Sequence, residues 1–331
     1  MGFRLAAQGI ELSDNTYLDY FRRYFTIRRL NLYGAALARI GIGAVILQLC
    51  LVNYFDRRLL WGPDGPWSLS RFEESTDRNL SLYSLNSGPA WFEFLFGLQI
   101  VVTVLYIAGY RGRMVSPLFA VLTFSLLQRN GYLLNGGENL LITILPFLAL
   151  LDSTRRLSVD SLLRRGTEVR RIRLAPAVYS TIVHNAAVVA IIVQVCIVYV
   201  VAGMYKVRGT MWTSGEALYY IMGVPEYGSR LLQGFLAEHP LLMSAMAYST
   251  IVLQVTFPVF VFFRRTRVYV LLAAIVFHLA IAVVMALPDF SFIMIATEML
   301  LLDDPHYRSL AGRLGFDAPR KIPPSTCSPS T

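Results

Sequence analysis

Charged side chains are scarce in this sequence. Asp, Glu, Lys and Arg make up 15% of the 331 residues, whereas hydrophobic residues make up 55%, and the mean hydropathy is +0.52. An ordinary soluble domain carries about 25% charged residues, so this composition excludes that class. Apolar stretches close to the roughly 20 residues that cross a bilayer recur along the chain. The composition therefore predicts an integral membrane protein.

Cysteine is also rare. The chain has Cys50, Cys196 and Cys327, and none of them belongs to a CxxC pair. A disulfide framework and a thiolate metal site are therefore not favoured, and no metal is predicted. The sequence also lacks a nucleotide-binding loop, a zinc-binding helix motif and a strand–glycine–helix unit for a dinucleotide.

The apolar stretches predict the fold class. Hydrocarbon cannot satisfy an open backbone, and no barrel-type alternation occurs, so the spans must be helical. The prediction is an all-α, multipass transmembrane bundle of about eight spans, in which some helices are short or broken. The third, fourth and eighth stretches are short, so each can be tilted, broken or part of a re-entrant hairpin. The eight stretches are residues 31–54, 89–109, 114–127, 138–151, 178–204, 241–263, 268–287 and 290–302.

Arginine predicts the orientation. The chain has 28 arginines, and with eight spans the arginine-rich segments before the first span and after the second, fourth, sixth and eighth all fall on one side. Positive loops stay inside, so both termini are expected to be cytoplasmic in the cell membrane. The net charge of +9 then matches anionic membrane lipid, and no nucleic-acid partner is expected. Residues 1–30 form the cytoplasmic segment with an amphipathic interfacial helix, 31–303 the transmembrane domain, and 304–331 a disordered cytoplasmic tail.

Lysine is the rarest basic residue. The chain has two, and Lys206 is the one outside the C-terminal tail. It follows the apolar stretch 178–204, at a point where the chain becomes polar. A lysine there can extend its side chain to the headgroups. It can also be desolvated enough to act as a base, because burial disfavours its charged form. The sequence alone leaves both interpretations open.

Other polar residues within the spans form two groups, one in the inner half of the membrane and one at its outer side. Arg39 lies about eight residues into the first span, and Glu298 about eight residues into the last span, which runs the other way, so their depths are expected to match. A buried Arg39–Glu298 ion pair is therefore predicted. His278 lies halfway along the seventh span, and an ionisable residue at such a depth is a functional candidate by default.

Asn135 to Glu138 lie at the outer end of the fourth span. Asn135 can serve as an N-cap and Glu138 suits the first turn, so this segment can simply start a helix. The alternative is that the two glycines keep non-helical backbone at membrane depth, lining a cavity. The aromatic stretch 212–220 after Lys206 can be a lid over that cavity or an aromatic belt.

Two motifs in the chain carry a resemblance. The fourth-span motif reads Gln128-Arg129-Asn130-x-x-x-Leu134-Asn135-Gly136-Gly137-Glu138-Asn139-Leu140-Leu141, and the second reads Ala202-Gly203-x-x-Lys206 with Trp212 and Gly215. The fourth-span motif is similar to the signature of the HTTM (horizontally transferred transmembrane) family, which is shared with vitamin K-dependent gamma-carboxylase. The segment from Ala202 to Leu218 resembles its second signature, and Phe277-His278 with residues 290–301 resembles its last two spans. The resemblance covers roughly residues 30–303.

The resemblance implies a chemistry. In the carboxylase a lysine deprotonates vitamin K hydroquinone, and Lys206 occupies the matching position. Oxygen then turns the quinol into a strong base and finally an epoxide, while a substrate glutamate is carboxylated. The implied catalytic residues are Lys206, Glu138 and His278, and the implied cofactor is a reduced quinone of the vitamin K or menaquinone type. The residues implied to bind it are Asn135, Gly136, Gly137, Tyr205 and Trp212.

Two departures leave the function open. The carboxylase has a histidine where this chain has Gly136-Gly137-Glu138, and its large peptide-holding domain has no counterpart after residue 303. One interpretation is a quinol-dependent oxygenase or carboxylase-like enzyme. Another is a maturation or immunity partner for a secreted peptide, like the family members that resemble the sporulation-delaying-protein maturation factor, although the cysteine pair of that subgroup is missing. The third is a non-catalytic membrane module.

Overall fold

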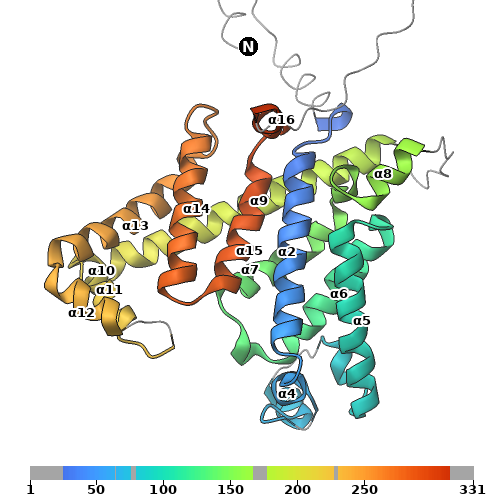
Figure 1. Cartoon of the computed structure of the whole chain (residues 1–331), viewed down its shortest axis with the longest axis horizontal. Helices are drawn as coiled ribbons and strands as arrows, with labels where there is room; N and C mark the ends of the chain where they lie inside the picture. Colours follow the sequence, from blue (N-terminus) through green and yellow to red (C-terminus); the bar gives the residue numbers. More distant parts are fainter. Residues whose placement is uncertain (1–24, 64, 76–79, 167–176, 227–229, 314–331) are drawn as a thin grey trace, which may run out of the picture.

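The computed structural model describes residues 25–63, 65–75, 80–166, 177–226 and 230–313. All regular structure in these ranges is helical, so the all-α prediction is confirmed (Figure 1). The predicted interfacial helix falls on residues 1–30, of which 1–24 lie outside the described ranges; residues 25–27 are helical.

Each predicted span corresponds to one helix. These helices are α2 (Leu32–Val52), α5 (Pro89–Ala108), α6 (Gly112–Arg129), α7 (Gly136–Leu150), α9 (Ala177–Arg208), α13 (Pro240–Phe260), α14 (Arg267–Val284) and α15 (Pro288–Glu298). Shorter helices connect them: α3 (Arg57–Trp61), α4 (Leu69–Ser75), α8 (Val159–Gly166), α10 (Thr210–Thr213), α11 (Ala217–Met222), α12 (Arg230–Glu238) and α16 (Asp304–Arg313).

Five helices in the described ranges are long and apolar enough to cross a bilayer: α2, α5, α9, α13 and α14. The count of eight spans is therefore not shown. Helix α7 has 15 residues and α15 has 11, which is short of the 20 or so that the hydrocarbon core requires. Helix α6 has 18 residues but includes Arg113 and Arg129, and it is less apolar.

Helices α2, α5, α14 and α15 run roughly side by side, whereas α9 crosses the bundle diagonally (Figure 1). Helix α9 has 32 residues, which corresponds to about 48 Å. That length exceeds the roughly 30 Å of hydrocarbon in a bilayer, so the helix must be inclined. The inclination carries Lys206, near its C-terminal end, toward α13 and α14.

Small residues bring α2 against α15. A Cβ atom on Gly41 would lie 2.7 Å from Cβ of Ala296, and a Cβ on Gly34 would collide with the carbonyl oxygen of Met299. Glycine at these two positions lets the helices approach closely, as is common between membrane helices. The two glycines are seven residues apart and therefore mark one face of α2.

This packing explains why the predicted Arg39–Glu298 ion pair is wrong. Arg39 lies about 140–160° around α2 from the face with Gly34 and Gly41 that contacts α15. It is 1% exposed and donates a hydrogen bond from Nη2 to the carbonyl oxygen of Leu157 at 2.5 Å. Glu298 has other partners, Tyr199 and His278. The sequence matched the depths of the two residues but could not orient the helix faces.

One end of the bundle collects ion pairs between segments that are distant in sequence. Asp152 pairs with Arg29 and with Arg155, and Arg267 Nη1 lies 2.8 Å from Asp303 Oδ2. Figure 1 places α8, α16 and the turn between α13 and α14 at this end, and α4 at the opposite end. Arg29, Arg155 and Arg267, which belong to three of the basic segments, therefore lie on one side of the molecule.

The predicted disordered tail differs from the structure over residues 304–313, which form α16. Asp304 occupies the first turn, where a carboxylate is favoured, and its Oδ1 accepts a hydrogen bond from Tyr33 N at 3.0 Å. Tyr307 packs near Tyr33 and donates to the carbonyl oxygen of Met299 at 2.6 Å. These contacts hold the helix against α2. Residues 314–331 lie outside the described ranges.

Candidate functional site

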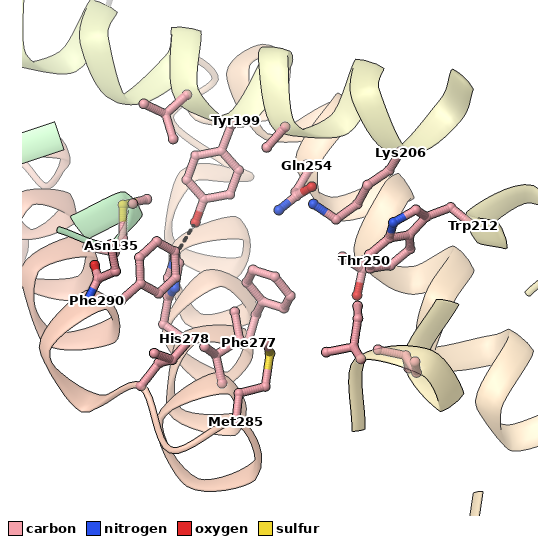
Figure 2. A pocket seen from close by; sticks show the side chains of 18 residues that line it. Asn135, Tyr199, Lys206, Trp212, Thr250, Gln254, Phe277, His278, Met285 and Phe290 are labelled. Atoms are coloured by element: carbon pink, nitrogen blue, oxygen red, sulfur yellow. Dashed lines mark hydrogen bonds between the residues drawn. The ribbon is translucent and has the colours of Figure 1, made fainter. Parts of the chain in front are cut away.

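A cavity of about 530 Å³ lies among α9, α13, α14 and α15, near the start of α7. It is called the Lys206 cavity below (Figure 2). Its polar lining residues are Asn135, Tyr199, Lys206, Trp212, Thr250, Gln254 and His278, and most of its other lining residues are apolar, among them Phe277, Ile281, Met285 and Phe290. A few polar groups in an apolar enclosure of this size are typical of a small-molecule site.

Lys206 lies near one end of the cavity, in the last turns of α9. It is half-buried, and its Nζ lies 4.9 Å from the centre of the Trp212 ring. No carboxylate of the described residues lies within 4.0 Å of it. The ring face stabilises an ammonium by about 0.5–2 kcal/mol. An amine at the wall of the cavity, with no carboxylate of the described residues beside it, is placed to exchange a proton with a ligand.

Gln254 shares the cavity with Lys206, and Figure 2 shows both side chains directed into it. Helices α9 and α13 approach closely here, because a Cβ on Gly203 would lie 3.2 Å from the backbone nitrogen of Val255. Gln254 is 8% exposed, and its Oε1 has no hydrogen-bond partner. A buried acceptor without a partner costs roughly 1–3 kcal/mol. The cavity therefore offers one unused acceptor to a ligand.

Tyr199, His278 and Glu298 form a buried triad at another part of the cavity. The Tyr199 hydroxyl donates to Glu298 Oε1 at 2.5 Å and lies 3.0 Å from His278 Nε2. The same histidine nitrogen lies 3.2 Å from Glu298 Oε1. Tyr199 and His278 line the cavity, while Glu298, fully buried, lies behind them. Tyr199 also stacks on Phe257 at 3.8 Å between ring centres, which fixes the phenol.

The segment from Asn135 to Glu138 forms a capping box. The side chain of Asn135 accepts a hydrogen bond from Gly137 N at 2.7 Å, and Glu138 Oε2 accepts one from Asn135 N at 2.9 Å. Glu138 is 4% exposed and does not line the cavity. Gly137 lies against the backbone of Phe290, where a Cβ would be 2.7 Å from Cα. The carboxylate thus starts α7, as in the first of the two interpretations of this segment.

The structure brings together some of the residues expected to form the site. Lys206, His278, Asn135, Gly136 and Trp212 line one cavity. Glu138, Gly137 and Tyr205 do not line it, and Tyr205 is 76% exposed on the outside of α9. Tyr205 is next to Lys206 in the sequence, but neighbouring residues lie on different faces of a helix.

Sequence reasoning missed Tyr199, Gln254 and Thr250. The spacing could have identified Tyr199, because it precedes Lys206 by seven residues and therefore lies on the same face of the helix. Gln254 is a polar residue inside an apolar span, which is a reason to examine it. Among the described residues, no group of three His, Cys, Asp or Glu side chains is arranged to hold a metal. The lining suits an amphipathic organic molecule.

Comparison with known proteins identifies the family of this chain. The model of the HTTM domain matches residues 80–305, a range that includes all residues of the Lys206 cavity. The chain belongs to the HTTM family. With its five candidate spans, this HTTM protein is a membrane protein. It is also similar to the sporulation-delaying protein SdpB of Bacillus subtilis (strain 168), with 24% identity over 229 residues, which are 66% of this chain and 65% of SdpB. The match therefore spans slightly less than two thirds of that relative. No solved structure matches.

Proposed function

We propose that this HTTM protein binds a reduced quinone in the Lys206 cavity and acts on it as a quinol-dependent oxygenase or carboxylase-like enzyme, with Lys206 as the base. The observation that carries the proposal is a half-buried lysine that has no carboxylate partner among the described residues, in an apolar cavity that also offers an unused acceptor at Gln254. A reduced quinone has a flat apolar ring and hydroxyl groups, so it complements both features.

The lining residues fit such a ring. Phe277 and Phe290 present aromatic faces to the cavity, and aromatic rings favour offset or edge contacts with one another. A hydroxyl on the ligand can donate to Gln254 Oε1, which satisfies that buried acceptor. Asn135 and Thr250 add polar side chains at the wall. The volume of about 530 Å³ lies within the usual range of small-molecule sites.

Each polar residue has a role in the proposal. Lys206 Nζ takes a proton from a ligand hydroxyl, and Trp212 stabilises the ammonium that results. Tyr199 and His278 hold a proton at a second place in the cavity, with Glu298 behind them. A bound quinol supplies the redox chemistry with oxygen. Glu138 has no part in this mechanism, since its carboxylate is engaged in the cap of α7.

The test is quinone epoxide formation. Purified protein in lipid is given reduced menaquinone or vitamin K and oxygen, beside Lys206→Met. The matched control is Lys321→Met, which removes the other lysine of the chain. Epoxide from the unaltered protein and the control, with a large loss in Lys206→Met, supports the enzyme. Folded protein that makes no epoxide argues against it.

We also propose that eight spans cross the membrane and that both termini are cytoplasmic. The gathering of Arg29, Arg155 and Arg267 at one end of the bundle supports this orientation. These arginines would then face the anionic lipid of the inner leaflet. Labelling of single cysteines, introduced at Leu59 and at Leu310, tests it: both side chains are exposed and belong to opposite ends. Only the cysteine at 59 is expected to react with an impermeant reagent added outside intact cells.

A second candidate is a partner in the maturation of a secreted peptide. The similarity to a sporulation-delaying protein favours it. In this role the Lys206 cavity would hold a side chain of the peptide. An acidic side chain fits best, because its carboxylate would supply the counter-ion that Lys206 lacks among the described residues. Expression of this chain in Bacillus subtilis without SdpB tests the idea. Restored release of the mature secreted peptide into the medium supports this role, and its continued absence beside well-expressed protein contradicts it.

A further inference from the structure

A second cavity of about 560 Å³ adjoins the Lys206 cavity, between α13 and α14. It is called the α13–α14 cavity here. The two cavities share the residues Leu218, Thr250, Phe277, Ile281 and Met285 in their walls. The two cavities therefore lie directly beside each other, on either side of these side chains.

The side chains that line the α13–α14 cavity offer an occupant no free hydrogen-bond donor. Its walls are apolar except for Ser249 and Thr250. Both hydroxyls already donate to the carbonyl oxygen of Met246 on the same helix, at 2.9 and 3.0 Å. Such backbone bonding is how polar hydroxyls are satisfied within membrane helices. An occupant of this cavity has to be apolar along its length.

The same cavity opens onto the outside of the bundle. Leu272 and Val276 of α14 are among its lining residues and are 54% and 66% exposed. Helices α13 and α14 are both long and apolar enough to cross a bilayer. The surface on which these side chains are exposed therefore faces lipid, so an occupant enters sideways from the hydrocarbon.

The cavity is also long enough for a segment of hydrocarbon chain. Its α14 wall runs from Leu272 to Val284, which corresponds to about 18 Å along the helix axis. The Met222 and Leu218 side chains of α11 close part of it. These dimensions suit an extended hydrocarbon chain, whereas a flat ring alone would leave most of the wall uncovered.

We propose that the α13–α14 cavity binds the apolar tail of the ligand whose polar ring lies in the Lys206 cavity. The ligand is then a bilayer lipid with a tail of several isoprenoid or methylene units. This proposal rests on the proposed function for the ring. It excludes a tail-less, water-soluble quinol as the natural ligand.

Binding, measured without oxygen and therefore without turnover, tests the proposal. The protein is placed in nanodiscs, and naphthohydroquinones with no, one, two or four prenyl units are compared at equal mole fraction in the lipid. Trp212 lines the Lys206 cavity, so quenching of its fluorescence reports the ring. Trp212→Phe gives the background from the three other tryptophans. Because all tails are equally surrounded by lipid, only contacts with the protein raise affinity, and we expect about fivefold from no tail to four units.

Variants locate the effect. Ala273→Phe and Ala280→Phe fill the α13–α14 cavity without reaching the Lys206 cavity, and they should remove the dependence on tail length. Val283→Phe is the matched control, because it adds the same ring to α14 at an 83% exposed position outside both cavities. If the alanine variants do not fold, the tail series on the unaltered protein still decides.

The outcomes separate this proposal from the proposed function. Affinity that is equal for all tails, or a tail effect that survives in Ala280→Phe, overturns the tail site alone. Tail-dependent binding without any epoxide supports the tail site and contradicts the enzyme. Quinols that do not bind at any tail length overturn both proposals.

Discussion

The hydroxyl of Tyr199 donates its hydrogen to Oε1 of Glu298 across the bundle interior, at 2.5 Å. A hydrogen bond to a charged acceptor is short and about twice as strong as a neutral one. Glu298 is fully buried, and His278 is its other hydrogen-bonding neighbour. This contact joins α9 to α15 inside the bundle, beside the Lys206 cavity, so it bears on both stability and the site.

Tyr199→Phe removes that donor while keeping the ring. The carboxylate of Glu298 then loses its shortest hydrogen bond, and we expect a loss of roughly 1–3 kcal/mol in the free energy of unfolding. Thermal or denaturant unfolding in detergent measures it. Tyr205→Phe is the matched control on the same helix, since Tyr205 is 76% exposed, and it should unfold like the unaltered protein. Equal stability of the two variants would contradict the role given to the Tyr199–Glu298 bond.

Lys206→Met is expected to fold, and to lose no more than about 1 kcal/mol in the free energy of unfolding. The reason is that the side chain has no carboxylate partner within 4.0 Å in the described ranges and gives up only its contact with Trp212. Unfolding in detergent checks this beside Tyr199→Phe. A melting temperature that falls as far as in the tyrosine variant would move Lys206 to a structural role.

The sequence predicts the helices well and their rotation poorly. Each apolar stretch became one helix, because hydrocarbon requires an internally satisfied backbone. The Arg39–Glu298 pair failed because matching depths say nothing about helix faces, and the packing of Gly41 on Ala296 turns Arg39 away.

The site was predictable only where a motif or a rare residue marked it. Lys206 and His278 were identified because ionisable residues at membrane depth are unusual. Tyr199 and Gln254 were missed, since their roles arise from α9 meeting α13 and α15, contacts that depend on tertiary packing. Glu138 was marked by its motif, but a motif position cannot distinguish a cap from a reacting group.

Glu138 offers a test of that distinction. Glu138→Gln retains an oxygen that can accept from Asn135 N, so the capping box should survive. Glu138→Ala loses it and is expected to cost about 0.5–2 kcal/mol. Unfolding of both variants, together with quinol binding, measures the effect. A glutamine variant that folds normally but loses all ligand-dependent activity would show that the carboxylate has a chemical role.

Gly109 is needed beside Arg39. Its φ of +67° is left-handed, and a Cβ would collide with the Arg39 guanidinium and lie 2.5 Å from Cβ of Ser158. Gly109→Ala should therefore destabilise the protein by about 1–3 kcal/mol. Gly97→Ala in α5 is the control, because nothing lies within 4 Å of its Cβ. It should leave stability unchanged or raise it by up to about 1 kcal/mol. Comparable losses in both variants would indicate that any alanine in this region is harmful.

A double-mutant cycle tests the separation of Arg39 from Glu298. Each side chain is at least 99% buried and has its own partners, Leu157 for the arginine and Tyr199 for the glutamate. Arg39→Ala and Glu298→Ala should each destabilise the protein, because each removes buried hydrogen bonds. Sites that share no partner add independently, so the double variant should lose the sum of the two within about 0.5 kcal/mol. Unfolding of the four proteins under one condition measures the coupling. If the double variant instead loses about 1 kcal/mol less than that sum, the two side chains interact, and the ion pair suggested by their matching depths would be supported.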